Sequence, residues 1–188
     1  MTTWDGESYQ DRFDRLEAAG VSVHGEADFV MDRRPASVLD AGCGTGRLAR
    51  ELARRGVAAV GIDVDPSMIE TARQLAPDQT WLLGDVGRID LGRTFDVVVM
   101  AGNVPLFTPE GTQAALVAGC ARHLDPGGTL ITGFQLDRHY GLAEYDDHCR
   151  RAGLERVERW ATWARDPFVE GGGYAVSVHR VPPEAVTD

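Results

Sequence analysis

Three glycines at alternate positions, Gly42, Gly44 and Gly46, follow a short apolar run at residues 37–41 and precede a helical stretch that begins near Arg47. Glycine has no Cβ atom, so the backbone can bend sharply there and approach a ligand closely. A helix that starts directly after such a turn directs its unpaired N–H groups and the positive end of its dipole toward that ligand. The segment therefore predicts a strand–turn–helix unit that binds a nucleotide-like or carboxylate-bearing molecule.

The spacing of the turn excludes several nucleotide-binding proteins. A dinucleotide-binding fold favours G-x-G-x-x-G, whereas this chain has G-x-G-x-G with Arg47 in the place of the third glycine. A phosphate-binding P-loop needs a lysine, and all 19 basic residues of this chain are arginines. The same absence excludes a lysine nucleophile and a pyridoxal Schiff base.

Further apolar runs, each followed by an acidic residue or a turn, continue the pattern. The runs at 58–62 and 80–83 predict a second and a third strand, and they lead into Asp63 and Asp85. An acid after the second strand can accept hydrogen bonds from both ribose hydroxyls of an adenosine. An acid after the third strand is well placed to accept one from an adenine amino group. Residues 95–100 predict a fourth strand, and residues 124–131 predict a turn followed by a fifth.

In this order, the glycine turn, the two acids and the turn Leu124-Asp125-Pro126-Gly127-Gly128 closely resemble the class I S-adenosylmethionine-dependent methyltransferases, over about residues 37–134. The resemblance implies that the glycine turn holds the methionine part of the cofactor, Asp63 the ribose and Asp85 the adenine. The cofactor-binding residues that it implies are Asp40, Ala41, Gly42, Cys43, Gly44, Gly46, Asp63, Val64, Met68, Asp85, Val86 and Ala101.

The alternation of strands and helices predicts an α/β fold with a mostly parallel sheet. The resemblance adds a Rossmann-like sheet of seven strands in the order 3-2-1-4-5-7-6, with strand 7 antiparallel and helices on both faces. We expect one domain over residues 1–188, with a helical cap at 1–36 and the core at 37–188. Helices are predicted at 9–19, 23–33, 110–123 and 143–152, and the last two strands at 154–165 and 174–181.

Each motif also has a purely structural interpretation. The glycine turn could be an ordinary strand–helix connection, and Asp63 and Asp85 could be solvated carboxylates or helix caps. We interpret Cys43 as a small residue in a tight turn and not as a nucleophile. No Cys-X-X-Cys pair occurs in the chain, and we predict no metal site.

The composition of the chain limits the kinds of molecule that we expect it to bind. A net charge of −10 opposes binding to nucleic acid, because phosphates would repel the protein. No run approaches the roughly 20 apolar residues of a membrane span. The three cysteines and the absence of a secretory signal at the first residues predict a cytoplasmic protein with reduced thiols. We therefore expect a small-molecule substrate, and the oligomeric state stays open.

The resemblance implies direct displacement at a sulfonium methyl group, with a general base only if the acceptor carries a proton. The candidate bases are His24 and Glu26, which precede the core, and Asp137, His139 and Tyr140, which follow the fifth strand. Each of them is also readily interpreted as a surface polar residue.

Asn103 follows the fourth strand, where amino-directed methyltransferases carry an Asn-Pro-Pro-Tyr-like motif. The match is partial, since Asn103 is followed by Val104 and Pro105. We favour a loop in which Asn103 makes a local hydrogen bond, with substrate contact as the alternative. Two other functions stay open: an NAD(P)-dependent oxidoreductase, and a methyltransferase-like protein that binds the cofactor or a partner without turnover.

Overall fold

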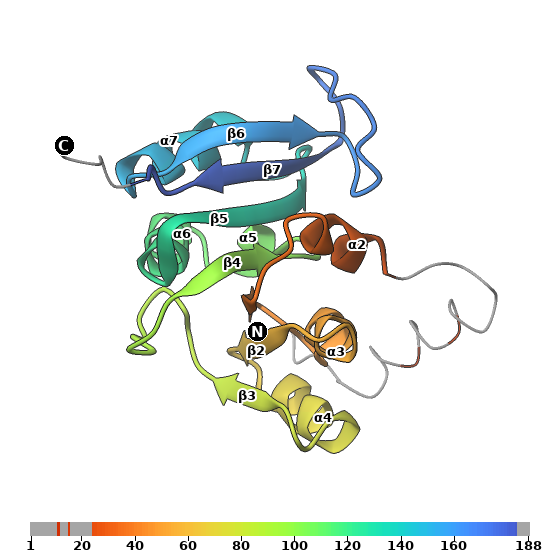
Figure 1. Cartoon of the computed structure of the whole chain (residues 1–188). Coiled ribbons are helices and arrows are strands. Elements are labelled where there is room, and N and C mark those ends of the chain that lie inside the picture. Colours follow the sequence, from red (N-terminus) through yellow and green to blue (C-terminus); the bar gives the residue numbers. More distant parts are fainter. Residues whose placement is uncertain (1–10, 12–14, 16–23, 184–188) are drawn as a thin grey trace, which may run out of the picture.

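Seven strands form one mixed sheet in the computed structural model, which describes Asp11, Arg15 and residues 24–183. Their order across the sheet is β3-β2-β1-β4-β5-β7-β6 (Figure 1). The strands are β1 (Ser37–Ala41), β2 (Ala58–Asp63), β3 (Thr80–Leu83), β4 (Phe95–Met100), β5 (Leu124–Gln135), β6 (Glu155–Trp160) and β7 (Tyr174–Arg180). The first five are parallel, and β7 runs antiparallel between β5 and β6. The predicted strand order and the antiparallel seventh strand are confirmed.

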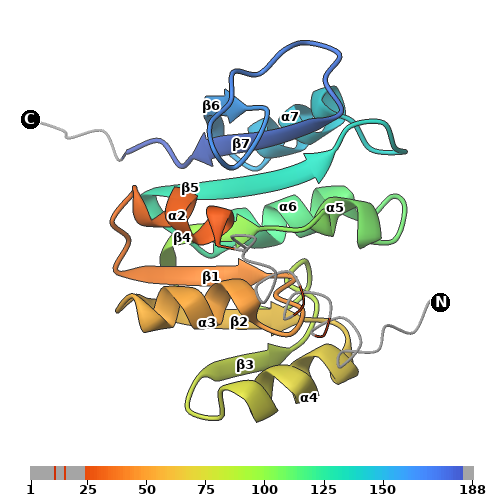
Figure 2. The same ribbon diagram turned by 90° about the vertical axis from the view of Figure 1, so that its right-hand side faces the viewer.

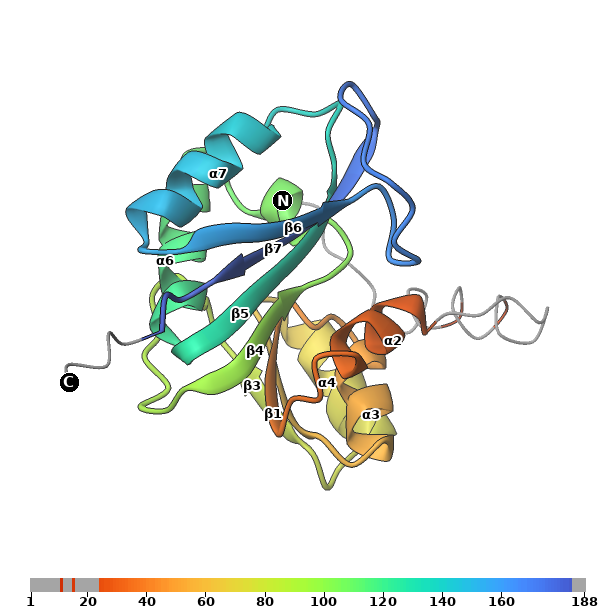
Figure 3. The same cartoon turned by 45° about the horizontal axis from the view of Figure 1, so that its top comes forward.

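Helices cover both faces of this sheet, as predicted (Figures 2 and 3). One face carries α2 (Gly25–Met31), α3 (Arg47–Arg54) and α4 (Pro66–Leu75). The other carries α6 (Gln113–Arg122) and α7 (Leu142–Arg151), and the short α5 (Val104–Phe107) follows β4. Strands of a parallel sheet that is covered on both faces are mostly apolar, and β1 and β4 are buried along nearly their whole length.

Each face of the sheet has its own apolar core. On the side of α2 and α3, Phe29, Leu52 and Val99 belong to one buried cluster. On the side of α6 and α7, Phe134 and Tyr145 belong to a second cluster. The strands are therefore held from both sides, which fixes the positions of their ends.

The candidate site lies where the strand order changes direction. β1 pairs with β2 on one side and with β4 on the other, so the connections from these strands diverge at their carboxyl ends. Ligands of open α/β sheets bind at such a switch point. The glycine turn that follows β1 is at this position.

Element boundaries differ from the sequence-based predictions in a few places. The strand predicted at 154–165 ends at Trp160, because Ala161 N–H donates to Asp166 O at 2.8 Å and closes a loop. The helix predicted from residue 110 begins at Gln113, since Gly111 has φ +83° and Thr112 N–H bonds Pro109 O at 3.0 Å. The helix predicted at 9–19 lies outside the described residues, apart from Asp11 and Arg15.

No helix among the described residues is long and apolar enough to cross a membrane.

Candidate cofactor site

The glycine turn between β1 and α3 adopts the backbone that its sequence predicts. Gly42, Gly44 and Gly46 have φ angles of +78°, +54° and +79°, values that favour glycine. The N–H groups of Gly42 and Cys43 both donate to Ile62 O of β2, at 2.8 and 3.0 Å. These bonds hold the turn at the ends of β1 and β2.

Two of the glycines also make room for large neighbours. A Cβ atom on Gly42 would lie 2.6 Å from Val104 Cγ2, and one on Gly46 would lie 2.1 Å from Trp81 Cη2. A Cβ on Gly61 of β2 would likewise meet Trp81, at 2.5 Å. Sequence reasoning assigned no role to Trp81 or Val104. A glycine inside the strand at 58–62 was the available signal, because such a glycine marks close approach of another group.

Asp63, the predicted ribose residue, is built into the turn. Its carboxylate accepts hydrogen bonds from the N–H groups of Gly44 at 2.8 Å and Asp65 at 3.0 Å. Burial raises the pKa of the Asp63 carboxyl, and these two backbone bonds oppose the rise. Asp63 therefore joins the end of β2 to the middle of the glycine turn.

Asp40 lies beneath the same turn. Its side chain is 1% exposed, and its carboxylate accepts a hydrogen bond from Ala49 N–H of α3 at 3.2 Å. Burial raises the pKa of Asp40 to about 7, although the positive charge of Arg47 acts in the opposite direction. A carboxyl that titrates near neutral pH beside a ligand-binding turn is a functional candidate.

Cys43 has the properties of a packed residue. Its side chain is 9% exposed, and burial raises the pKa of its thiol well above the ordinary value. A thiolate nucleophile needs the opposite shift. This agrees with its interpretation as a small residue in a tight turn.

The residues predicted around ribose and adenine fall into exposed and buried groups. Val64 is 65% exposed directly after Asp63, whereas Met68 and Val86 are buried. Asp85 is about half exposed, accepts from Gly87 N–H at 2.9 Å and lies 3.4 Å from Arg88 Nε. Asp85 therefore keeps carboxylate surface open to solvent after β3.

Ala101 and Asn103 follow β4 and differ in what they contact. Ala101 is partly buried against the core on the α2 side. Asn103 has φ +69°, its side-chain oxygen accepts from Gln135 N–H at 2.8 Å, and its own N–H donates to Gly133 O at 3.2 Å. The local hydrogen bond favoured for Asn103 is therefore present, and it joins the ends of β4 and β5.

The two candidate bases that precede the core lie at α2, near the turn. Glu26 makes a two-pronged ion pair with Arg47, at 2.6 and 3.2 Å. His24 directly precedes α2 and is partly buried. The pairing of Glu26 with Arg47 was not foreseen, because the sequence does not show which of many acids an arginine meets.

The three candidates after β5 do not share one environment. Asp137 and His139 are exposed, and Asp137 lies 3.7 Å from Arg138 Nε. Tyr140, by contrast, is 1% exposed in the core on the α7 side, and its hydroxyl bonds His148 Nδ1 at 2.8 Å. Burial raises the pKa of Tyr140 above its ordinary value. Tyr140 is therefore a core residue and not the surface polar residue that its sequence position allowed, since its ring packs against Phe134 and Tyr145.

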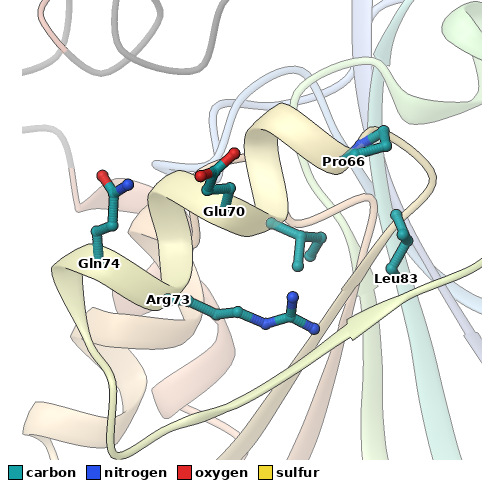
Figure 4. A pocket seen from close by; sticks show the side chains of 6 residues that line it. Pro66, Glu70, Arg73, Gln74 and Leu83 are labelled. Atoms are coloured by element: carbon teal, nitrogen blue, oxygen red, sulfur yellow. The ribbon is translucent and has the colours of Figure 1, made fainter.

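An open groove of about 480 Å³ lies between α4 and β3 (Figure 4). Arg73 reaches across it from α4 and donates to Trp81 O at 3.3 Å. The lining residues are Pro66, Ile69, Glu70, Arg73, Gln74 and Leu83. None of them is a predicted cofactor residue, so we place the candidate site at the glycine turn and not in this groove.

Comparison with known proteins identifies the family of this chain. The family described as Methyltransferase domain matches residues 38–128, which include the whole turn and both acids. The structure superposes with a TM-score of 0.87 on a TehB-like S-adenosylmethionine-dependent methyltransferase from Corynebacterium glutamicum. The two are 34% identical, and the alignment covers 93% of this chain and 96% of that one.

The alignments with curated relatives cover a smaller share of those proteins' own lengths. A dTDP-3-amino-3,4,6-trideoxy-alpha-D-glucopyranose N,N-dimethyltransferase from Streptomyces venezuelae is 35% identical over 56% of this chain and 46% of its own length. A trans-aconitate 2-methyltransferase from Azoarcus sp. is 30% identical over 86% of this chain and 59% of its own length. The chain thus matches only about half of the length of these relatives.

Proposed function

Since this chain belongs to the class I S-adenosylmethionine-dependent methyltransferases, we propose that it transfers a methyl group from that cofactor to a small-molecule acceptor. The observation that carries the proposal is the glycine turn: three positive-φ glycines, tied to β2 and held by Asp63, at the switch point of the sheet. The alternative of an NAD(P)-dependent oxidoreductase is set aside by family membership. Binding without turnover is tested below.

The residues at the turn fit the cofactor. Gly44, in the middle of the turn, has no side chain, so a ligand could lie directly against its backbone. The space that side chains of Gly42 and Gly46 would need is filled by Val104 and Trp81. Asp63 would hold the ribose hydroxyls, and the exposed Val64 beside it offers an apolar surface to the adenine. Asp85, with its half-exposed carboxylate, would accept from the adenine amino group. Asp40 would act at the methionine end, beneath the turn.

When bound, S-adenosylmethionine supplies a methyl group on a positively charged sulfur that is a good leaving group. The protein's part is to hold the acceptor in line with that bond. Positioning of this kind can lower a barrier by roughly 7–11 kcal/mol. The local bonds of Asn103 stiffen the loop between β4 and α5, where we expect the acceptor to lie.

A small acceptor is supported by charge and by the relatives. The net charge of −10 opposes a nucleic acid substrate. Two relatives are named for small acceptors, an amino-sugar nucleotide and trans-aconitate. The exposed Asp137 and His139 are the base candidates that we carry forward at the end of β5, since Glu26 is already engaged by Arg47.

The test is turnover with labelled cofactor. The full chain is incubated with methyl-labelled S-adenosylmethionine and a metabolite extract, and labelled products and S-adenosylhomocysteine are measured. The Asp63→Ala variant serves as a control. We expect label in a small molecule from the parent and none from the variant. Tight binding of S-adenosylhomocysteine without label transfer to any fraction would favour a protein that binds without turnover, and label in RNA or protein would overturn the small-molecule assignment.

A further inference from the structure

Arg47 occupies the first position of α3, directly after Gly46, where a dinucleotide-binding turn would carry its third glycine. Its side chain is mostly buried, unlike that of a typical surface arginine. It forms two bonds with the Glu26 carboxylate of α2, at 2.6 and 3.2 Å, and the two side chains are 16% and 18% exposed. A two-pronged pair of this kind fixes both position and orientation.

The position of Arg47 matters because charged groups near Asp40 affect the ionisation of its carboxyl. Asp40 is 1% exposed, and its hydrogen bond from Ala49 N–H ties it to the first turn of α3. Asp63 of β2 and Glu26 of α2 act on it with negative charge, and Arg47 acts with positive charge. The nearby Cys43 thiol is kept uncharged by burial. Among these charged side chains, Arg47 is the one that favours an ionised Asp40 carboxylate, and the hydrogen bond from Ala49 N–H acts in the same direction.

We propose that Arg47 is a positioning residue of the cofactor turn: Glu26 fixes its guanidinium, and its charge favours the ionised form of the buried Asp40 carboxylate, which we assign to cofactor binding. The proposal rests on the proposed function, because it assumes that the turn binds S-adenosylmethionine. It gives α2, which lies before the sheet in the chain, a direct electrostatic connection to the turn after β1.

The sign of the effect follows from the burial of Asp40. Burial alone disfavours the charged form, so the carboxyl of the parent protein titrates near neutral pH. Without the positive charge of Arg47, only the hydrogen bond from Ala49 N–H opposes burial and the negative charges of Asp63 and Glu26, so Asp40 takes up its proton at higher pH. If cofactor binding needs the ionised Asp40 carboxylate, the pH at which affinity falls must rise by the same amount as the pKa of Asp40.

The experiment measures S-adenosylhomocysteine affinity by calorimetry from about pH 5.5 to about pH 9, with the full chain. For the parent, affinity should fall as pH drops through about 7. In Arg47→Met the midpoint should rise by about one pH unit, with roughly fivefold weaker binding at neutral pH and recovery at the highest pH. The ligand's own groups titrate identically in every variant, so only differences between variants are interpreted.

Four further variants separate electrostatics from structure. Arg47→Lys keeps the positive charge, so its midpoint should return close to that of the parent. Asp40→Asn should remove the transition, and adding Arg47→Met to it should shift nothing further. Arg54→Met removes an exposed arginine of the same helix and should bind like the parent. Melting curves of each variant report whether the fold is intact.

Two results would overturn the proposal. Equal losses in Arg47→Met and Arg47→Lys at all pH values would show a merely structural ion pair. An unshifted midpoint in Arg47→Met would show that Arg47 does not act on Asp40.

The role of Glu26 is tested separately by Glu26→Gln, whose effect on affinity should be non-additive with that of Arg47→Met. Additive effects would contradict the role of Glu26. A parent protein that does not bind S-adenosylhomocysteine at any pH would refute the proposed function itself.

Discussion

At the scale of single residues, the buried carboxylate of Asp40 carries a cost to folding. Burial raises its pKa from the ordinary 3.8 to about 7, so the unfolded chain gives up this proton at lower pH than the folded protein does. The free energy of unfolding therefore falls as pH rises from about 4 to about 7 and stays reduced above that range. The carboxylate that we assign to the cofactor thus destabilises the protein that lacks the cofactor.

Replacing Asp40 by Asn should reverse this cost. We expect Asp40→Asn to raise the free energy of unfolding at about pH 8, by up to about 4 kcal/mol, and to give no gain below about pH 4. Urea denaturation at the two pH values checks this, with Asp78→Ala as an exposed control. Equal stability of parent and variant at the higher pH would show that Asp40 is not a buried ionised group.

Gly46 illustrates how two constraints act on one residue. Its φ of +79° strains any other residue, and a Cβ atom would lie 2.1 Å from the ring of Trp81. Gly56, with φ +89° and no atom within 4 Å of a Cβ, shares only the first constraint. We expect Gly46→Ala to cost about 1–3 kcal/mol more than Gly56→Ala in thermal or chemical unfolding. Trp81→Leu should reduce that difference, and an equal cost at the two glycines would mean that the ring moves aside freely.

At the scale of elements, α4 begins at Pro66 because Asp65 caps it. The Asp65 carboxylate accepts from Ser67 N–H at 2.8 Å, and Pro66 occupies the first helical position. Asp65→Ala should lower the free energy of unfolding by about 1 kcal/mol. Because Asp65 N–H also binds Asp63, the backbone bond should persist and cofactor affinity should change less than in Asp63→Ala. A larger loss of affinity in Asp65→Ala would indicate that the cap itself shapes the site.

The attachment of α7 to the sheet depends on Asp146. Burial raises the pKa of this carboxyl, but the nearby His179 of β7, whose Nε2 lies 3.3 Å away, and two hydrogen bonds from Arg159 of β6 outweigh burial and hold it at about 2. Because the folded pKa lies below the ordinary 3.8, the stabilisation is complete above that value and is lost as pH falls through about 2. We expect Asp146→Asn to cost about 1–2 kcal/mol near neutral pH, allowing for solvent screening, and almost nothing near pH 2. A pH-independent cost would contradict this linkage.

At the scale of the whole molecule, cofactor binding should appear as added stability. A ligand at 100 times its dissociation constant stabilises a protein by about 2.7 kcal/mol. For a chain of this length that corresponds to a rise in Tm of roughly 5–11 °C. We expect such a rise with saturating S-adenosylhomocysteine and none with NAD or NADP, measured by calorimetric melting. A rise with a nicotinamide cofactor alone would contradict the assignment.

The strands of the sheet could be predicted from the sequence more fully than the side-chain packing around the glycine turn. Apolar runs such as 95–100 and acids such as Asp63 were recognisable because strand ends and glycines are local signals. The strand order came from the family resemblance, and the structure confirms it. The Glu26–Arg47 pair, the ring of Trp81 beneath Gly46 and the burial of Tyr140 could not be predicted, because each depends on contacts between segments far apart in the chain.

The close contact between Trp81 and the glycine turn also gives the protein an optical reporter. The indole is 5% exposed, lies against the positions of Gly46 and Gly61, and donates its N–H to Ala76 O at 2.9 Å. Its fluorescence therefore depends on the few atoms that separate it from the turn, and a ligand that settles on the turn changes the surroundings of the ring. With Trp4, Trp160 and Trp163 replaced by Phe, emission from Trp81 would follow occupancy in real time, without a label and in a stopped-flow instrument.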